Sequence, residues 1–201
     1  MDVVTTPSTG ARPRVTGERE REILRAAFDV LREVGYDKLT IDTVAARARA
    51  SKATLYRRWP SKAALVVETM ACLEGEHDVP DTGSLRGDLV GMAEHKGEGV
   101  FGADSAEVVF GLATAMHRDD ELREAFLAEF LGPKQACIRT IFERGRARGE
   151  VADGVDLELV GQILPSLMLF RMSLGGGTDA PDRLAVRIID EVVLPACRRT
   201  G

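Results

Sequence analysis

The chain has 201 residues, of which 44% are hydrophobic and 29% charged, and its formal net charge is −5 at pH 7, all ordinary for a globular protein of one domain or two small ones. No apolar run approaches the roughly 18 residues that a membrane-spanning helix needs, and the N-terminus lacks a signal-peptide core, so we expect no membrane partner. The cysteines (Cys72, Cys137 and Cys197) are odd in number and far apart, which argues for a reducing cytoplasm and against a disulfide framework or a zinc site.

The first part of the chain predicts an arm followed by short helices. Residues 1–16 contain Thr, Pro and Arg without a helical pattern and are expected to be flexible. Apolar residues then recur at helical spacing over residues 17–34, and Gly35 suits the position that terminates a helix. Three further helices are expected at residues 41–48, 52–59 and 62–76, with N-caps at Thr40, Ser51 and Ser61.

The rest of the chain also shows helical periodicity and contains no hairpin or βαβ pattern. Helices are expected at residues 85–98, 105–117, 121–148, 157–173 and 182–198. Gly132-Pro133 is expected to break or kink the long central helix, and Asp119 to cap its start. The sequence therefore predicts an all-α fold, in which a three-helix module at residues 17–62 precedes a helical bundle at residues 63–201.

The segment from residue 39 to residue 62 is far more basic than the rest of the chain. One acidic residue, Asp42, accompanies six cations there: Arg47, Arg49, Lys52, Arg57, Arg58 and Lys62. Residues 1–62 together hold 13 Lys and Arg against 8 Asp and Glu, whereas residues 63–201 hold 14 against 24. A basic head on an acidic body is expected when only one end of a molecule approaches nucleic acid.

Two short helices joined by a three-residue turn have the layout of a helix-turn-helix, whose second helix enters the major groove of DNA. The inward face of that helix is expected to close a hydrophobic core: Leu55 and Trp59, with Leu24, Leu39 and Val44. Its outward face presents four polar side chains: Lys52, Thr54, Tyr56 and Arg57. The alternative is a helical hairpin with a solvated charged face, which leaves the paired caps and the one-sided cations without a reason.

Each outward residue has an expected role in DNA binding. Lys52 and Thr54 lie near the helix N-terminus and suit base edges or adjacent phosphates. Arg57 suits a bidentate pair with guanine, and the hydroxyl of Tyr56 suits a phosphate. Arg58 either joins them or is solvated.

Further phosphate contacts are expected from neighbouring segments. Thr40 begins the second helix and Lys62 begins the fourth, where backbone N–H groups favour an anion. Arg12 and Arg14, on the arm, either reach a minor groove or belong to a solvated tail.

These residues match a known pattern. The stretch T-I-D-T-V-A-A-R-A-R-A-S-K-A-T-L-Y-R-R-W-P-S-K-A-A-L, preceded by R-E-R-E-I-L-R-A-A-F-D-V-L-R-E-V-G-Y, resembles the N-terminal domain of TetR-type transcriptional regulators over residues 17–66. The resemblance implies a homodimeric, all-helical regulator, usually a repressor, whose C-terminal domain binds a small effector that releases double-stranded DNA. It assigns DNA contacts to Thr40, Lys52, Thr54, Tyr56, Arg57 and Lys62.

The last two expected helices are apolar around most of their circumference, which indicates burial on both sides. In the related regulators such helices meet their symmetry mates, so the resemblance implies a homodimer through residues 157–173 and 182–198. The alternative is an intramolecular core. A two-fold dimer would require an approximately palindromic operator.

An effector pocket, partly apolar, is expected among the central helices. Its candidate lining comprises Met92, Phe110, Met116, Phe126, Phe130 and Phe170, with His117 and Gln162 as polar contacts, and less specifically His95 and Phe101. Each apolar residue has the alternative of belonging to the core.

Two other classes of protein remain as alternatives. A constitutive architectural DNA binder would need no effector. Such a protein would not need the large, acidic, aromatic-containing helical bundle at residues 63–201. An enzyme is not expected, because the sequence contains none of the motifs G-x-S-x-G, H-E-x-x-H or P-loop, and its histidines are scattered. We expect no catalytic residue, metal ligand or cofactor.

Overall fold

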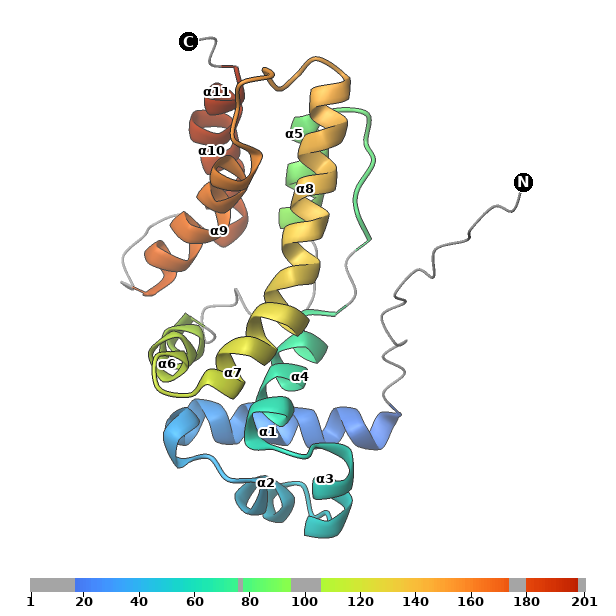
Figure 1. The fold of residues 1–201 in the computed structure, drawn as a ribbon, viewed down its shortest axis with the longest axis vertical. Helices are drawn as coiled ribbons and strands as arrows, with labels where there is room; N and C mark the ends of the chain where they lie inside the picture. Colours follow the sequence, from blue (N-terminus) through green and yellow to red (C-terminus); the bar gives the residue numbers. More distant parts are fainter. Residues whose placement is uncertain (1–16, 76–77, 95–105, 174–179, 199–201) are drawn as a thin grey trace, which may run out of the picture.

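A computed structural model describes residues 17–75, 78–94, 106–173 and 180–198. Within these ranges all regular structure is helical, which confirms the predicted all-α class (Figure 1). The elements are α1 (Glu18–Lys38), α2 (Ile41–Arg47), α3 (Lys52–Arg58), α4 (Lys62–Glu74), α5 (Leu85–Ala93), α6 (Ala106–Met116), α7 (Asp120–Ala125), η1 (Phe126–Leu131), α8 (Gly132–Ala147), α9 (Leu157–Ser173), α10 (Pro181–Ile188), η2 (Ile189–Val193) and α11 (Leu194–Cys197).

The helices form two groups. In Figure 1, α1 crosses the bottom of the view with α2 and α3 beneath it, and α5 and α8–α11 lie at the other end. α4 packs on α1, α7 and η1, while α6 packs on α1 and α9. The small helical module thus occupies one end of the molecule, where α2 and α3 have one side free.

Side-chain hydroxyls fix the starts of the helices in the basic segment. The hydroxyl of Thr40 accepts the N–H of Thr43, whose own side chain accepts the N–H of Thr40, a reciprocal capping box. Ser51 accepts the N–H of Thr54 at 3.1 Å. Ser61 accepts the N–H of Ala64 at 3.1 Å. The three predicted N-caps are therefore confirmed, and each helix begins within a residue of its expected position.

Glycine and proline shape the helix ends and bends. Gly35 has φ 75° and ψ 170°, a conformation essentially restricted to glycine, so the helical geometry of α1 is interrupted there. One more turn follows, and α1 ends at Lys38. The predicted break at Gly132-Pro133 is not a separation of two helices. A wide π-helical turn, η1, lies directly before it, and the chain continues into α8 with Pro133 in the first turn. Because proline has no N–H and its ring crowds the preceding turn, such a wide turn lets the helix continue.

Two hydrophobic clusters make up the core. The first joins α1–α4 with α6, α7 and η1, and the second joins α5 with α8–α11. α4 contributes Ala63, Leu65, Val66, Val67 and Met70 to the first cluster. The expected division between residues 62 and 63 stays a prediction, and the apolar packing is continuous across it.

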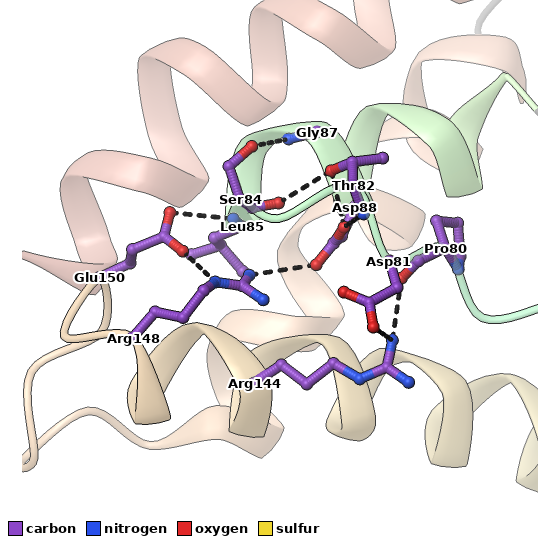
Figure 2. Close-up of polar contacts among 10 residues, drawn as sticks. All are labelled: Pro80, Asp81, Thr82, Ser84, Leu85, Gly87, Asp88, Arg144, Arg148 and Glu150. Carbon is purple, nitrogen blue, oxygen red and sulfur yellow. Dashed lines mark hydrogen bonds and ion pairs between the residues drawn. The ribbon is translucent and has the colours of Figure 1, made fainter.

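A buried carboxylate organises the second group of helices (Figure 2). Asp88, in α5, is 0% exposed. It accepts hydrogen bonds from the backbone N–H and the hydroxyl of Thr82, at 2.6 and 2.7 Å, and from Arg148 at 3.1 Å. Arg148 also donates to Glu150, which accepts the N–H of Leu85 at 2.9 Å. The start of α5 is thereby tied to the end of α8.

Two further observations concern the cysteines and the apolar helices. Cys72, Cys137 and Cys197 are all free thiols. Among the described residues, no helix combines the length and the apolarity that crossing a membrane requires.

Candidate DNA-binding surface

The turn between α2 and α3 is held by a side chain of α1. Arg49 has a positive φ of 49°, an unusual conformation for a residue other than glycine. The guanidinium of Arg19 donates to the carbonyls of Ala48 and Arg49, at 2.7 and 3.0 Å. These carbonyls follow the last turn of α2 and have no helical partner of their own, so Arg19 stabilises the turn that sets the angle of α3.

The inward face of α3 is buried as the sequence predicts. Leu55 is 0% and Trp59 1% exposed, and both lie in one core cluster with Leu24, Leu39 and Val44. Trp59 also donates its indole N–H to Glu68 at 2.9 Å. This anchoring leaves the opposite face of α3 directed away from the body.

The outward face carries the four expected side chains, all exposed: Lys52, Thr54, Tyr56 and Arg57. Tyr56 is 52% exposed, which is high for a large aromatic residue with no packing role. Among the residues that the structure describes, the side chain of Arg57 has no ion pair or hydrogen bond. Thr40 is exposed at the start of α2, on the neighbouring element.

One carboxylate lies within this surface. Lys52 donates to Asp42 at 2.6 Å, and the side chains are 65% and 47% exposed. The hydrogen bond to Asp42 raises the pKa of Lys52, so the ammonium is charged throughout the physiological range. An exposed pair of this kind contributes little stability, so breaking it costs little.

Two of the six cations in the basic segment form ion pairs with carboxylates outside that segment, which corrects the impression of a nearly unopposed cluster. Arg47 makes a bidentate pair with Glu33 of α1, at 2.9 and 2.6 Å. Arg58 pairs with Glu20 at 2.8 Å and with Glu68, and its guanidinium lies 5.2 Å from the centre of the Trp59 ring. Arg58 therefore joins α3 to α1 and α4 through these carboxylates, although its side chain is 43% exposed.

Lys62 lies at the start of α4 and is partly enclosed. Its ammonium donates to the carbonyl of Tyr36 at 3.1 Å and lies 4.0 Å from the centre of the Tyr36 ring. Sequence reasoning missed both Tyr36 and Arg19, since their partners lie 26 to 30 residues away and no local pattern marks them.

The eight expected pocket residues lie in different surroundings in the described structure. Phe126 and Phe130 are buried with ring centres 4.7 Å apart, and Met116 packs against the same cluster. Met92 packs against the other cluster. The remaining four are exposed: Phe110, His117, Gln162 and Phe170. The two less specific candidates, His95 and Phe101, lie outside the described residues.

Two hollows of about 170 and 330 Å³ open between the end of α1 and α6. Both are lined by Gly35, Tyr36 and Gly111, and none of the eight expected residues borders them. A side chain at Gly35 or Gly111 would meet no atom within 4 Å, so the two glycines leave this space open.

α9 and the last helical segment have both a buried and an exposed apolar face. Val160, Leu164 and Met168 of α9 are buried within the chain. Other large apolar residues are exposed: Leu159 at 64%, Leu167 at 37% and Phe170 at 57% on α9, and Val192 at 40% on η2. The intramolecular core thus covers one side of these helices and leaves apolar surface on the other.

Most of the chain is similar to transcriptional regulators. Residues 23–69 match the family described as bacterial regulatory proteins, tetR family, and residues 79–192 match the tetracyclin repressor-like C-terminal domain. An HTH-type transcriptional regulator of Mycobacterium tuberculosis is 35% identical over 191 residues, with 94% of this chain and 92% of the relative covered.

Two further matches extend this likeness. The DNA-binding transcriptional repressor TetR of Mycobacteroides abscessus is 32% identical over 185 residues, with 90% of this chain and 94% of that protein covered. The solved structure of Salmonella enterica GusR has a TM-score of 0.67 at 18% identity and covers 92% of this chain and 99% of its own, so the fold is shared.

Proposed function

The chain belongs to the TetR family of helix-turn-helix transcriptional regulators, and on this basis we propose that it is a repressor that binds a palindromic operator as a homodimer and leaves it when a small effector binds. The observation that carries the proposal is the orientation of α3. Leu55 and Trp59 are buried beneath it, and four polar side chains face outward. That arrangement suits insertion of α3 into a major groove.

The proposed contacts divide between bases and phosphates. Arg57, free of protein partners among the described residues, would donate to guanine and read sequence. Lys52 and Thr54 would contact base edges or nearby phosphates, and Tyr56 a phosphate. Beside them, Thr40 and Lys62 would hold phosphates at the starts of α2 and α4.

The exposed apolar face of α9 and η2 supports the proposed dimer. A second copy would cover Leu159, Phe170 and Val192 and build a four-helix interface. A two-fold axis would then place two copies of α3 about 34–36 Å apart, one turn of DNA, or at a larger spacing.

The proposals of repression and of effector release are supported by the family, by the name of one relative and by the size of the C-terminal domain. The relative from Mycobacteroides abscessus is named a repressor. Residues 63–201, the proposed effector and dimerisation domain, are much larger than DNA binding needs. An effector would act by binding one arrangement of the two domains better than the other. We place the protein in the cytoplasm, where its DNA would be.

Selection of bound fragments from a random DNA pool tests the proposal. We expect one approximately palindromic site, bound with an affinity that falls steeply as salt rises. On that site, Arg57→Ala should relax sequence preference, while Lys62→Ala should weaken all sequences alike. Recovery of fragments with no common sequence would instead indicate an architectural binder.

A further inference from the structure

Tyr36 joins the DNA-binding module to the C-terminal bundle. It lies in the last turn of α1 and is 5% exposed. Its hydroxyl donates to Asp119 at 2.6 Å, across 83 residues of sequence. The other oxygen of Asp119 accepts the N–H of Leu122 at 2.9 Å and so caps α7, as predicted. One carboxylate therefore fixes both the start of α7 and the phenol of Tyr36.

The same tyrosine determines where the Lys62 ammonium lies. The ammonium donates to the backbone carbonyl of Tyr36 at 3.1 Å and lies 4.0 Å above its ring. An ammonium has three N–H donors. The carbonyl takes one and the ring face another, which leaves one for a phosphate at the N-terminus of α4.

The protonation states suit a permanent contact. Burial, and then the hydrogen bond to Asp119, raise the pKa of Tyr36 above its ordinary value. The hydrogen bond from Tyr36 lowers the pKa of Asp119. At neutral pH the phenol therefore remains a donor and the carboxylate an acceptor, so only movement of the two elements breaks the contact.

Resting on the proposed DNA-binding function, we propose that Tyr36 is a positioning residue of the DNA surface. Asp119 holds its ring, and the ring and carbonyl together hold Lys62 toward a phosphate. Movement of the corner between α6 and α7 thereby reaches the DNA surface through two contacts, without any change in α3.

A neighbouring ion pair provides a matched control. Arg118 donates to Asp37 at 2.7 Å, across the same boundary between α1 and the corner before α7. Its side chains are 60% and 70% exposed, and neither touches Lys62 in the contacts that the structure describes. If any link across this boundary affected DNA binding, loss of this pair would do so too.

The test is a double-mutant cycle on the selected operator fragment, with the dissociation constant measured over a salt series. Tyr36→Phe removes only the hydroxyl and keeps the ring and the carbonyl. We expect it to weaken binding by roughly three- to tenfold, and Lys62→Ala to lower the salt slope by about 0.9, one phosphate contact. In the Lys62→Ala background, Tyr36→Phe should add no further loss. Arg118→Ala should leave binding within about twofold of the original protein.

The outcome of the cycle decides whether Tyr36 acts through Lys62. An equal loss from Tyr36→Phe in both backgrounds would overturn the proposal, because Tyr36 would then act independently of Lys62. Should Tyr36→Phe fail to fold by circular dichroism, the same cycle with Asp119→Asn decides, since asparagine can still cap α7. If the original protein selects no operator at all, the proposed function fails, which is a different result from an additive cycle.

Discussion

Replacing Asp88 with alanine would measure what the buried carboxylate of Figure 2 contributes to stability. Asp88 is 0% exposed and accepts three hydrogen bonds, two from Thr82 and one from Arg148. Removing one partner of a buried ion pair costs about 3–5 kcal/mol. The Arg148 side chain is 28% exposed and keeps Glu150, so we expect a loss at the lower end, about 3 kcal/mol.

Urea denaturation followed by circular dichroism would measure the loss as a change in the free energy of unfolding. Asp190→Ala is the matched control. Asp190 also pairs with an arginine, Arg86, through two hydrogen bonds of 2.7 and 2.9 Å, but the side chains are 53% and 38% exposed. Exposed pairs contribute little, so we expect a much smaller change. Equal losses in the two variants would refute the argument from burial.

The same variant should reveal a dependence on pH. Burial raises the pKa of Asp88, but hydrogen bonds from Thr82 and Arg148 outweigh it, and the pKa lies below its ordinary value. A carboxyl group whose pKa is lower in the folded state stabilises the protein above its unfolded pKa, about 3.9. That stabilisation is lost as pH falls through the folded pKa. The stability gap between the original protein and Asp88→Ala should therefore be constant near neutral pH and shrink below about pH 4.

Three further changes test other parts of the structure. Gly35→Ala should lower the free energy of unfolding in urea by about 1–3 kcal/mol, because its φ of 75° and ψ of 170° suit only glycine; no loss would contradict the backbone assignment. Asp42→Asn removes the counter-charge of Lys52 and should tighten operator binding by up to about fivefold in a filter-binding titration, whereas weaker binding would place Asp42 among the DNA contacts. Phe170→Glu should convert the proposed dimer to a monomer in light scattering, while Leu127→Glu, at a comparably exposed apolar site, should not; a dimer in both would place the interface elsewhere.

Local chemistry explains why so much of the DNA-binding module could be predicted. Thr40, Ser51 and Ser61 accept N–H groups three residues ahead, so the helix starts depend only on neighbours in sequence. The inward face of α3 follows from the helical period, which places Leu55 and Trp59 on one side. The same period explains the exposure of Tyr56 and Arg57.

The roles of several charged and apolar residues could not be predicted, because their partners lie far along the chain. Arg58 is a cation on α3 and so has the chemistry of a DNA contact. It is nevertheless paired with Glu20, which lies 38 residues earlier, and with Glu68. Phe126 and Phe170 are equally hydrophobic, so the sequence gives no reason to prefer one over the other as a pocket-lining residue. Packing buries the first and leaves the second 57% exposed.

By itself the sequence determined the all-helical class, the helix-turn-helix and the outward residues of α3, since each follows from spacing, capping and charge over a few neighbouring positions. Only the tertiary structure decided which cations remain free and how the module is joined to the bundle through Tyr36 and Asp119. The physical reason is that ion pairs and buried hydrogen bonds depend on distances in space between helices, and the spacing of residues along one chain does not fix those distances.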